Sequence, residues 1–251
     1  MNWPAVRWRD VPTVSSSSLR RADVDARVRF GIEALQLMEI AGWQVARFVD
    51  AFTGGIRGRH VTVVAGAGNN GGDALAAARF LLQRGAMASV SMVSPTDGAS
   101  LVAHHANIIR RMGILAREAP DGIGGSTDLI IDGLLGTGIR PPPREPASRI
   151  IEAINGAGRP IIAIDVPSGL DADTGLGAEG AVRATATVTL VAPKAGLASA
   201  SNAGRVFLAD LGMPANLFGT AGVALAALYA VGDLIELVDP ERRLVPDTTP
   251  S

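Results

Sequence analysis

Short runs of β-favouring residues alternate with helical stretches along most of the chain. The runs occupy residues 61–65, 88–93, 128–132, 160–165, 186–191 and 205–208, and glycine, proline or polar residues follow most of them. Strong helix formers, or apolar residues spaced three and four apart, fill 74–84, 101–112 and 146–155. Strands that are apolar throughout are typical of a parallel sheet buried on both faces. The pattern predicts an α/β fold with a mostly parallel central sheet between two layers of helices.

The segments on either side of this series differ from it. Residues 1–22 contain Pro4, Pro12 and a run of serines, which predicts an irregular N-terminal arm. Residues 23–52 carry a helical apolar spacing that ends at Gly54. We therefore expect one domain over residues 23–235, followed by a flexible C-terminal tail over 236–251.

Composition narrows the class of protein. The chain has 251 residues, a formal net charge of −1 and no cysteine. That charge gives no general attraction to nucleic acid or to an anionic membrane, and the absence of cysteine excludes disulfides and thiol chemistry. The N-terminus lacks the apolar core of a secretory signal, and the longest apolar stretch is shorter than the ~18 residues of a membrane span. We expect a cytoplasmic protein with neither a nucleic acid nor a membrane as its partner.

A glycine-rich turn follows the first strand of the series. Residues 66–73 read GAGNNGGD, and they include a G-x-G-x-x-G spacing that can bring backbone amides close to a phosphate at a helix N-terminus. A nicotinamide dehydrogenase also needs an acidic residue at the end of the second strand, whereas the first acid here is Asp97, in a loop. Tight packing is the other reading of the glycines, but packing does not require Asn69, Asn70 and Asp73.

Two further strands end in aspartate. Asp132 opens the sequence DGLLGTGIR, and Asp165 opens DVPSGLDADTG. A carboxylate at the end of a buried strand is costly unless it is paired, ligated or hydrogen-bonded. Because ligands bind at the carboxyl ends of parallel strands, the two aspartates predict either a cation site or an acid–base site beside the glycine-rich turn. Turn capping is the alternative for Asp132, and it is the preferred interpretation for Asp171 and Asp173.

Together these motifs resemble the NAD(P)HX epimerase family, also called the YjeF N-terminal domain family. The similarity covers roughly residues 20–215. It rests on several segments in the family's order and spacing: LMEIAG (37–42), GNNGGDAL (68–75), DGLLGTG (132–138), IDVPSGLDADTG (164–175), AVRAT (181–185), KAGL (194–197) and DLGMP (210–214).

The resemblance implies a three-layer Rossmann-like fold, a homodimer and one potassium ion per subunit. It implies that Asp165 binds substrate and that the metal ligands are Asn70, Asp132 and Ser168. It also implies substrate contacts from two loops: Asn69, Asn70, Gly71, Gly72 and Asp73 in the first, and Gly136, Thr137, Gly138, Ile139, Arg140, Pro141 and Pro142 in the second.

The implied activity is epimerisation of the R and S forms of hydrated NADH or NADPH (NADHX and NADPHX), a cofactor repair reaction. We expect Asp165 to be the catalytic acid–base group, protonating the departing hydroxyl and activating the returning water, with Lys194 as a candidate helper. Too few residues follow Pro214 for the nucleotide-dependent dehydratase domain fused to many relatives, so we expect pairing with a separate dehydratase.

Two alternatives remain open at this point. One is a non-catalytic binding scaffold with the same fold, which would be expected to lose the polar site residues. The other is an NAD-binding oxidoreductase, which the missing acid after the second strand disfavours. The homodimer is also expected from Trp43, Phe48 and Phe52, which extend beyond one narrow apolar stripe of their helix.

Overall fold

The computed structural model describes residues 3–93, 97–138 and 141–239. Within them, nine strands form one sheet in the order β1-β9-β8-β7-β6-β5-β2-β3-β4. Every neighbouring pair is parallel except β8 and β9. The strands are β1 (Ala5–Arg7), β2 (His60–Ala65), β3 (Met87–Met92), β4 (Leu115–Glu118), β5 (Leu129–Gly133), β6 (Ile161–Ile164), β7 (Ala186–Leu190), β8 (Arg205–Ala209) and β9 (Leu234–Val238). The mostly parallel sheet predicted from the sequence is confirmed.

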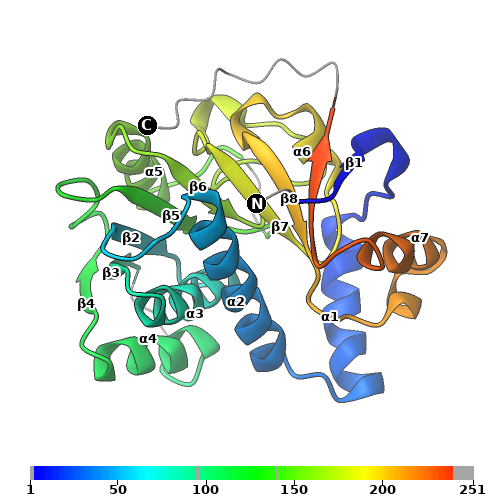
Figure 1. Ribbon diagram of the computed structural model, residues 1–251, viewed down its shortest axis with the longest axis horizontal. Coiled ribbons are helices and arrows are strands. Elements are labelled where there is room, and N and C mark those ends of the chain that lie inside the picture. The colour runs from blue at the N-terminus through cyan, green and yellow to red at the C-terminus, as the bar shows by residue number, and fades with distance from the viewer. Residues whose placement is uncertain (1–2, 94–96, 139–140, 240–251) are drawn as a thin grey trace.

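Helices cover both faces of this sheet (Figure 1). They are α1 (Ser16–Phe30), α2 (Ala34–Phe52), α3 (Asn69–Gln83), α4 (Leu101–Arg111), α5 (Ala147–Gly156), α6 (Ala195–Ser199) and α7 (Thr220–Tyr229). Successive strand residues point to opposite faces. Val63 and Ile131 therefore join the core beneath α2 and α3, whereas Val64 and Ile130 pack with the isoleucines of α5 on the other side. Because the strands are apolar throughout, both faces of the sheet are apolar, and each is covered by a layer of helices.

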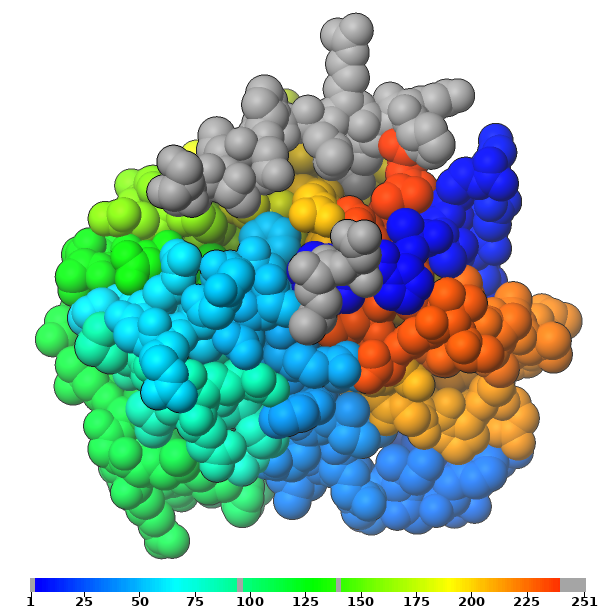
Figure 2. All heavy atoms as spheres, viewed as in Figure 1, coloured from blue at the N-terminus to red at the C-terminus, as the bar shows by residue number. Residues whose placement is uncertain are grey.

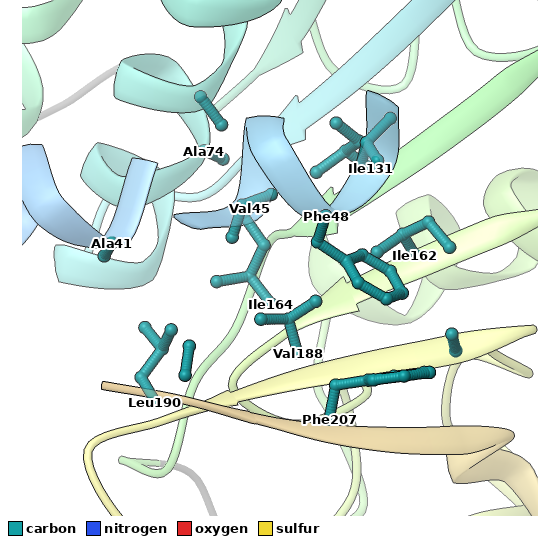
Figure 3. Close-up of a cluster of buried hydrophobic side chains, with 14 of the residues drawn as sticks. Ala41, Val45, Phe48, Ala74, Ile131, Ile162, Ile164, Val188, Leu190 and Phe207 are labelled. Atoms are coloured by element: carbon teal, nitrogen blue, oxygen red, sulfur yellow. The ribbon is translucent and has the colours of Figure 1, made fainter. Parts of the chain in front are cut away.

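Phe48 anchors α2 to the middle of the sheet. Its side chain is fully buried, and its ring centroid lies 4.6 Å from that of Phe207 on β8. Figure 3 shows Phe48 projecting from α2 toward Ile162, Val188 and Phe207. Phe52 packs against Phe48 as well, with 5.1 Å between the ring centroids. Of the three aromatic residues that suggested a dimer surface, these two therefore belong to the core, and Trp43 alone is substantially exposed.

The N-terminal arm is more ordered than the sequence predicts. It contains β1, and α1 begins at Ser16 because the Ser15 hydroxyl accepts a hydrogen bond from the Ser18 amide as an N-cap. The expected helix over 23–52 is two helices, because Gly31 adopts a φ of 68° that ends α1. Proline and serine suggested irregularity, but here serine serves as a helix cap.

The C-terminal segment also extends the sheet. β9 runs to Val238, three residues past the predicted end of the domain at residue 235, and it pairs with both β8 and β1. Figure 2 shows the red C-terminal segment beside the blue N-terminal one. Residues 240–251 of the predicted tail lie outside the described residues. β1 and β4 escaped prediction because they are short and have few buried side chains. In the part of the chain that the structure describes, no helix combines the length and apolar character needed to span a membrane.

Candidate active site

A cavity of about 620 Å³ opens at the carboxyl ends of the central strands. Its walls come from the residues that follow β2, β5 and β6, from the end of β7, and from α1 and α2. Seven residues expected at the site line it: Asn69, Asn70, Asp73, Gly136, Thr137, Gly138 and Asp165. The three motifs that are far apart in the sequence thus meet at one cavity.

The glycines of the first motif let two loops approach closely. A Cβ on Gly66 would lie 1.8 Å from the carbonyl oxygen of Leu134, and one on Gly71 would lie 1.9 Å from the carbonyl oxygen of Gly66. A larger residue at Gly66 would push the turn after β2 away from the loop after β5, and one at Gly71 would open the turn itself. Helix α3 starts at Asn69 directly after this contact, so its N-terminus faces the cavity. Tight packing therefore explains Gly66 and Gly71, but it does not explain Gly68 or the polar residues of the motif.

Several expected substrate contacts lie away from the cavity wall. The amides of Gly71 and Gly72 donate to the carbonyl of Gly68 inside the first turn of α3, and Gly72 packs against Met38. Pro141 packs against Gly177 instead, and neither it nor Pro142 lines the cavity. Ile139 and Arg140 lie outside the described residues. The substrate roles of these residues stay predictions.

Beneath the cavity, Asp132 and Ser168 form a fully buried pair. The Ser168 hydroxyl donates to Oδ1 of Asp132 at 2.6 Å, and the Ser168 amide donates to Oδ2 at 2.8 Å. Burial raises the pKa of Asp132 to about 6, although the hydrogen bonds from Ser168 and Leu134 oppose that shift. This pair ties the loop after β5 to the loop after β6.

Asn70 completes this buried polar group. Its side-chain nitrogen donates to the carbonyl of Leu135 at 2.9 Å, but its side-chain oxygen Oδ1 is buried and has no partner in the described residues. Buried acceptors are usually hydrogen-bonded, so this oxygen is free to coordinate a ligand. Amide, carboxylate, hydroxyl and carbonyl oxygens are the donor set that hard cations prefer. The residues present therefore fit a cation such as potassium, held by Asn70, Asp132 and Ser168.

Asp165 lies at the cavity in contact with a buried lysine. Lys194, 1% exposed, places its Nζ against Oδ1 of Asp165, and Nζ also donates to Thr189 Oγ1 at 3.1 Å and to the Leu190 carbonyl at 2.6 Å. The Leu190 amide donates to the same Oδ1 at 3.2 Å. Asp165 has a positive φ of 66°, and the Val166 amide donates to the Ile164 carbonyl across it. This is a γ-turn of the strained type, which directs Asp165 out of the strand.

Two more carboxyl groups border the same cavity. Asp73 projects from the first turn of α3, and Asp23 comes from α1. Burial, followed by the charges of Asp165 and Asp23, raises the pKa of Asp73 well above its usual value. Burial and the charge of Asp165 raise that of Asp23 as well. The site thus places three aspartates around one lysine, an arrangement suited to holding and moving protons.

Sequence reasoning missed Asp23 and gave Lys194 only a helper role. Lys194 had a signal, because it is the one lysine in a chain whose other strongly basic residues are all arginine. Asp23 had none, since it is a single acid at the start of the expected helix over 23–52, away from the ends of the strands. The expected turn roles are confirmed: Asp171 accepts from the amides of Asp173 and Thr174, and Asp173 caps the start of α1 at Ser16. None of the three histidines lines the cavity.

Comparison with known proteins agrees with this geometry. The family model described as YjeF-related protein N-terminus matches residues 34–196. The Rhodopirellula baltica protein named NAD(P)H-hydrate epimerase is 32% identical over 215 residues, covering 82% of this chain and 87% of that protein. The crystal structure of yeast ynu0 superposes with a TM-score of 0.74 at 28% identity, over 83% of this chain and 94% of that one.

Longer relatives match as well. The Salinibacter ruber protein named Bifunctional NAD(P)H-hydrate repair enzyme Nnr is 36% identical over 225 residues, which is 81% of this chain and 41% of that protein. A Moorella thermoacetica protein of the same name is 35% identical over 220 residues, and the match covers 42% of that protein. The chain therefore spans about two fifths of the length of these bifunctional relatives. The matched family region contains all three motifs that meet at the cavity, and the chain belongs to the YjeF-related protein N-terminus family.

Proposed function

We propose that this protein is an NAD(P)H-hydrate epimerase, which interconverts the R and S forms of hydrated NADH or NADPH in cofactor repair. The observation that carries the proposal is the convergence of the three motifs on one cavity in a chain similar to the Rhodopirellula baltica epimerase. A scaffold that only binds partners would not need a buried lysine and three aspartates around a cavity.

The cavity offers distinct places for the parts of such a substrate. Its volume of about 620 Å³ lies within the range of small-molecule sites. The N-terminus of α3, with Asn69 and the neighbouring Thr137–Gly138 loop, suits the negatively charged phosphates. The hydrated ring is then assigned to the part of the cavity beside Asp165 and Lys194.

The reaction inverts the ring carbon C6, so the bond from C6 to its hydroxyl must break and form again. Once the hydroxyl on C6 is protonated, the lone pair of the ring nitrogen can expel it as water. This leaves an iminium ion and one water molecule. Water then adds to the opposite face and returns a proton. Because an ammonium beside a carboxylate stabilises the ionised pair, we propose that Asp165 and Lys194 act together, with Lys194 holding the proton and Asp165 directing it.

Potassium is proposed as the cofactor held by Asn70, Asp132 and Ser168. A bound cation would fix the two loops that these residues connect, which is a positioning role. We expect the melting temperature to rise when potassium chloride replaces choline chloride at equal ionic strength, because a ligand that binds the native state stabilises it. Asp132→Asn should abolish that rise, and the exposed Asp121→Asn should retain it. A rise that survives Asp132→Asn would argue against this site.

The enzymatic proposal is tested by following the two epimers chromatographically. One epimer is removed selectively from a purified mixture, and the protein is then added. We expect rapid restoration of both epimers, with the R and S forms of hydrated NADH and NADPH tested separately. Restoration no faster than the spontaneous rate at high protein concentration would defeat the proposal.

Three further expectations belong with this proposal. They are a homodimer, a cytoplasmic location, and cooperation with a separate dehydratase that consumes the epimer formed. The bifunctional names of the longer relatives support the pairing of the two activities.

A further inference from the structure

The loop that carries Lys194 contains the second strained turn of the site. Val191 has a φ of 68°, and the Ala192 amide donates to the Leu190 carbonyl across it at 2.7 Å. This is again a γ-turn with positive φ, a rare conformation that is especially unfavourable for a β-branched residue. Within the described residues, Asp165 and Val191 are the non-glycine positions with positive φ, and both lie at the cavity.

The turn at Val191 is coupled directly to the reactive pair. The Leu190 carbonyl at its first corner accepts from Lys194 Nζ at 2.6 Å, and the Leu190 amide donates to Asp165 at 3.2 Å. If the Val191 peptide relaxed to a negative φ, the Leu190 carbonyl would rotate away from Lys194. The strain at Val191 is thus tied to the position of the lysine.

A tyrosine from outside the matched family region holds this turn. Tyr229, the one tyrosine of the chain, lies at the end of α7, and its hydroxyl donates to the Val191 carbonyl. Val191 and Leu211 separate the active-site cavity from a second cavity of about 180 Å³ lined by Tyr229, Phe218 and Leu225. The second cavity gives the Val191 peptide space to move into. Burial raises the pKa of Tyr229, so the phenol keeps its donor proton at neutral pH.

We propose that Tyr229 is a positioning residue for Lys194: its hydrogen bond holds the Val191 γ-turn in its strained form, and that turn directs the Leu190 carbonyl at the lysine. The inference extends the proposed epimerase function, because it assigns to α7 a role in the same site.

The chain offers a direct readout of this role that needs no substrate. Because Lys194 is the one lysine, an amine-acylating reagent such as N-hydroxysuccinimidyl acetate can label Lys194 and the N-terminal amine, which serves as an internal reference. In the wild type we expect very slow labelling of Lys194, since it is 1% exposed and held by three acceptors. Peptide mass spectrometry measures the two rates.

In Tyr229→Phe, labelling of Lys194 should accelerate several-fold and kcat should fall about tenfold with little change in KM. The matched second variant is Val191→Gly, because glycine adopts positive φ without strain. Added to Tyr229→Phe, it should return both labelling and kcat toward the wild-type values. Loss of packing alone would not be repaired by a smaller residue.

Each outcome decides the inference. Wild-type labelling and kcat in Tyr229→Phe would overturn it, and so would a double variant that is worse than Tyr229→Phe. If Tyr229→Phe does not fold, the double variant carries the test: wild-type labelling supports the inference, and an unfolded double variant overturns it. The wild-type protein could fail to epimerise while Lys194 is still labelled faster in Tyr229→Phe than in the wild type and the double variant. That result would refute the proposed function and leave the positioning role intact.

Discussion

Single buried charges determine much of what this site can do. Lys194 is removed from water, and its ammonium is compensated by Asp165 together with two neutral oxygens. Asp132 is equally buried but has hydrogen-bond donors in place of a cationic side chain. Since an isolated buried charge is costly, these two environments imply different chemistry. They fit the two proposed roles, in which Asp165 exchanges a proton with the substrate and Asp132 provides negative charge for a cation.

Asp165→Asn tests the first of these roles. We expect kcat to fall by about 10²–10⁴-fold, the usual contribution of an acid–base group, with a much smaller change in the substrate dissociation constant. Asp171→Asn is the matched control, because that carboxylate accepts from the amides of Asp173 and Thr174 and does not line the cavity. Steady-state kinetics and ligand titration measure both quantities. Near-full turnover in Asp165→Asn combined with lost turnover in Asp171→Asn would refute the assignment.

At the scale of single residues, the sequence predicted the positions of Asp132 and Asp165 but not the groups that contact them. A carboxylate that ends an apolar strand can be recognised from the sequence, which identified Asp132 and Asp165. The contact of Lys194 with Asp165 joins residues 29 apart and depends on the turn at Val191, which no local pattern encodes. The glycines of the first motif resembled a phosphate cradle, but Gly66 permits the close approach of the loop after β5, and Gly71 permits the tight turn itself.

The close approach of α2 and α3 shows how a motif can support the site through its element. Gly42 lies on α2 where a Cβ would come within 2.5 Å of the Cβ of Ala76 and 2.8 Å of the backbone of α3. Because α3 carries Asn69, Asn70 and Asp73, displacement of α3 would move three cavity residues together. The last glycine of the LMEIAG segment is therefore explained by packing.

Gly42→Ala should destabilise the protein by about 1–3 kcal/mol, the usual cost of overpacking a core. Gly156→Ala, at the end of α5, is the control, because a Cβ there meets nothing within 4 Å. Urea denaturation monitored by circular dichroism gives the free energy of unfolding of each variant. Equal stabilities for the two variants would mean that the α2–α3 contact tolerates an added methyl.

Helix α4 carries His105, a buried histidine whose protonation makes the stability of the protein depend on pH. Burial lowers the pKa of His105, although Glu39 on α2, 3.8 Å away, raises it; His104 and Arg79 lower it further. The folded state therefore binds fewer protons than the unfolded chain near and below pH 6.5, so stability from this group is lost as the pH falls.

Comparing urea midpoints at pH 7.5 and 5.5 measures this effect. His105→Leu should lose less stability on acidification than the wild type, because it has no buried imidazole to charge. His104→Leu, at the exposed neighbouring position, should behave like the wild type. The same loss on acidification in His105→Leu and the wild type would assign the pH dependence to other groups.

The regular elements were predicted where the apolar pattern was long, and missed where pairing is non-local. The six predicted strands are all present, with ends shifted by one residue at most. β1 and β9 become strands because they pair with each other and with β8, although they lie at opposite ends of the chain. No local propensity could show that pairing.

Across the whole molecule, the segments that flank the matched family region complete the site. α1 precedes residue 34 and contributes Asp23 to the cavity, whereas α7 follows residue 196 and contributes Tyr229 behind it. The β1–β9 pair joins the two ends of the described chain at one edge of the sheet. The matched family region thus contains Asp165 and Lys194, and the flanking elements supply Asp23 and Tyr229 around them.

The expected homodimer is also a property of these flanking elements. Val24 and Val28 lie one turn apart on α1 and are 60% and 75% exposed, and Trp43 on α2 is 45% exposed. Exposed apolar side chains are typical of a partner surface where they form a patch, as Val24 and Val28 do on α1. We therefore expect light scattering at micromolar concentration to give twice the mass of the 25.8 kDa chain. Val28→Glu should yield a monomer, because it would bury a charge in the interface.

Val223→Glu on α7 is the matched control for this prediction, since Val223 is 80% exposed and lies on a different helix. That variant should remain a dimer. A monomeric wild type would remove the dimer altogether, and a dimeric Val28→Glu paired with a monomeric Val223→Glu would move the interface from α1 to α7. In the second case the interface would adjoin Tyr229, and dimerisation would be expected to affect the turn that positions Lys194.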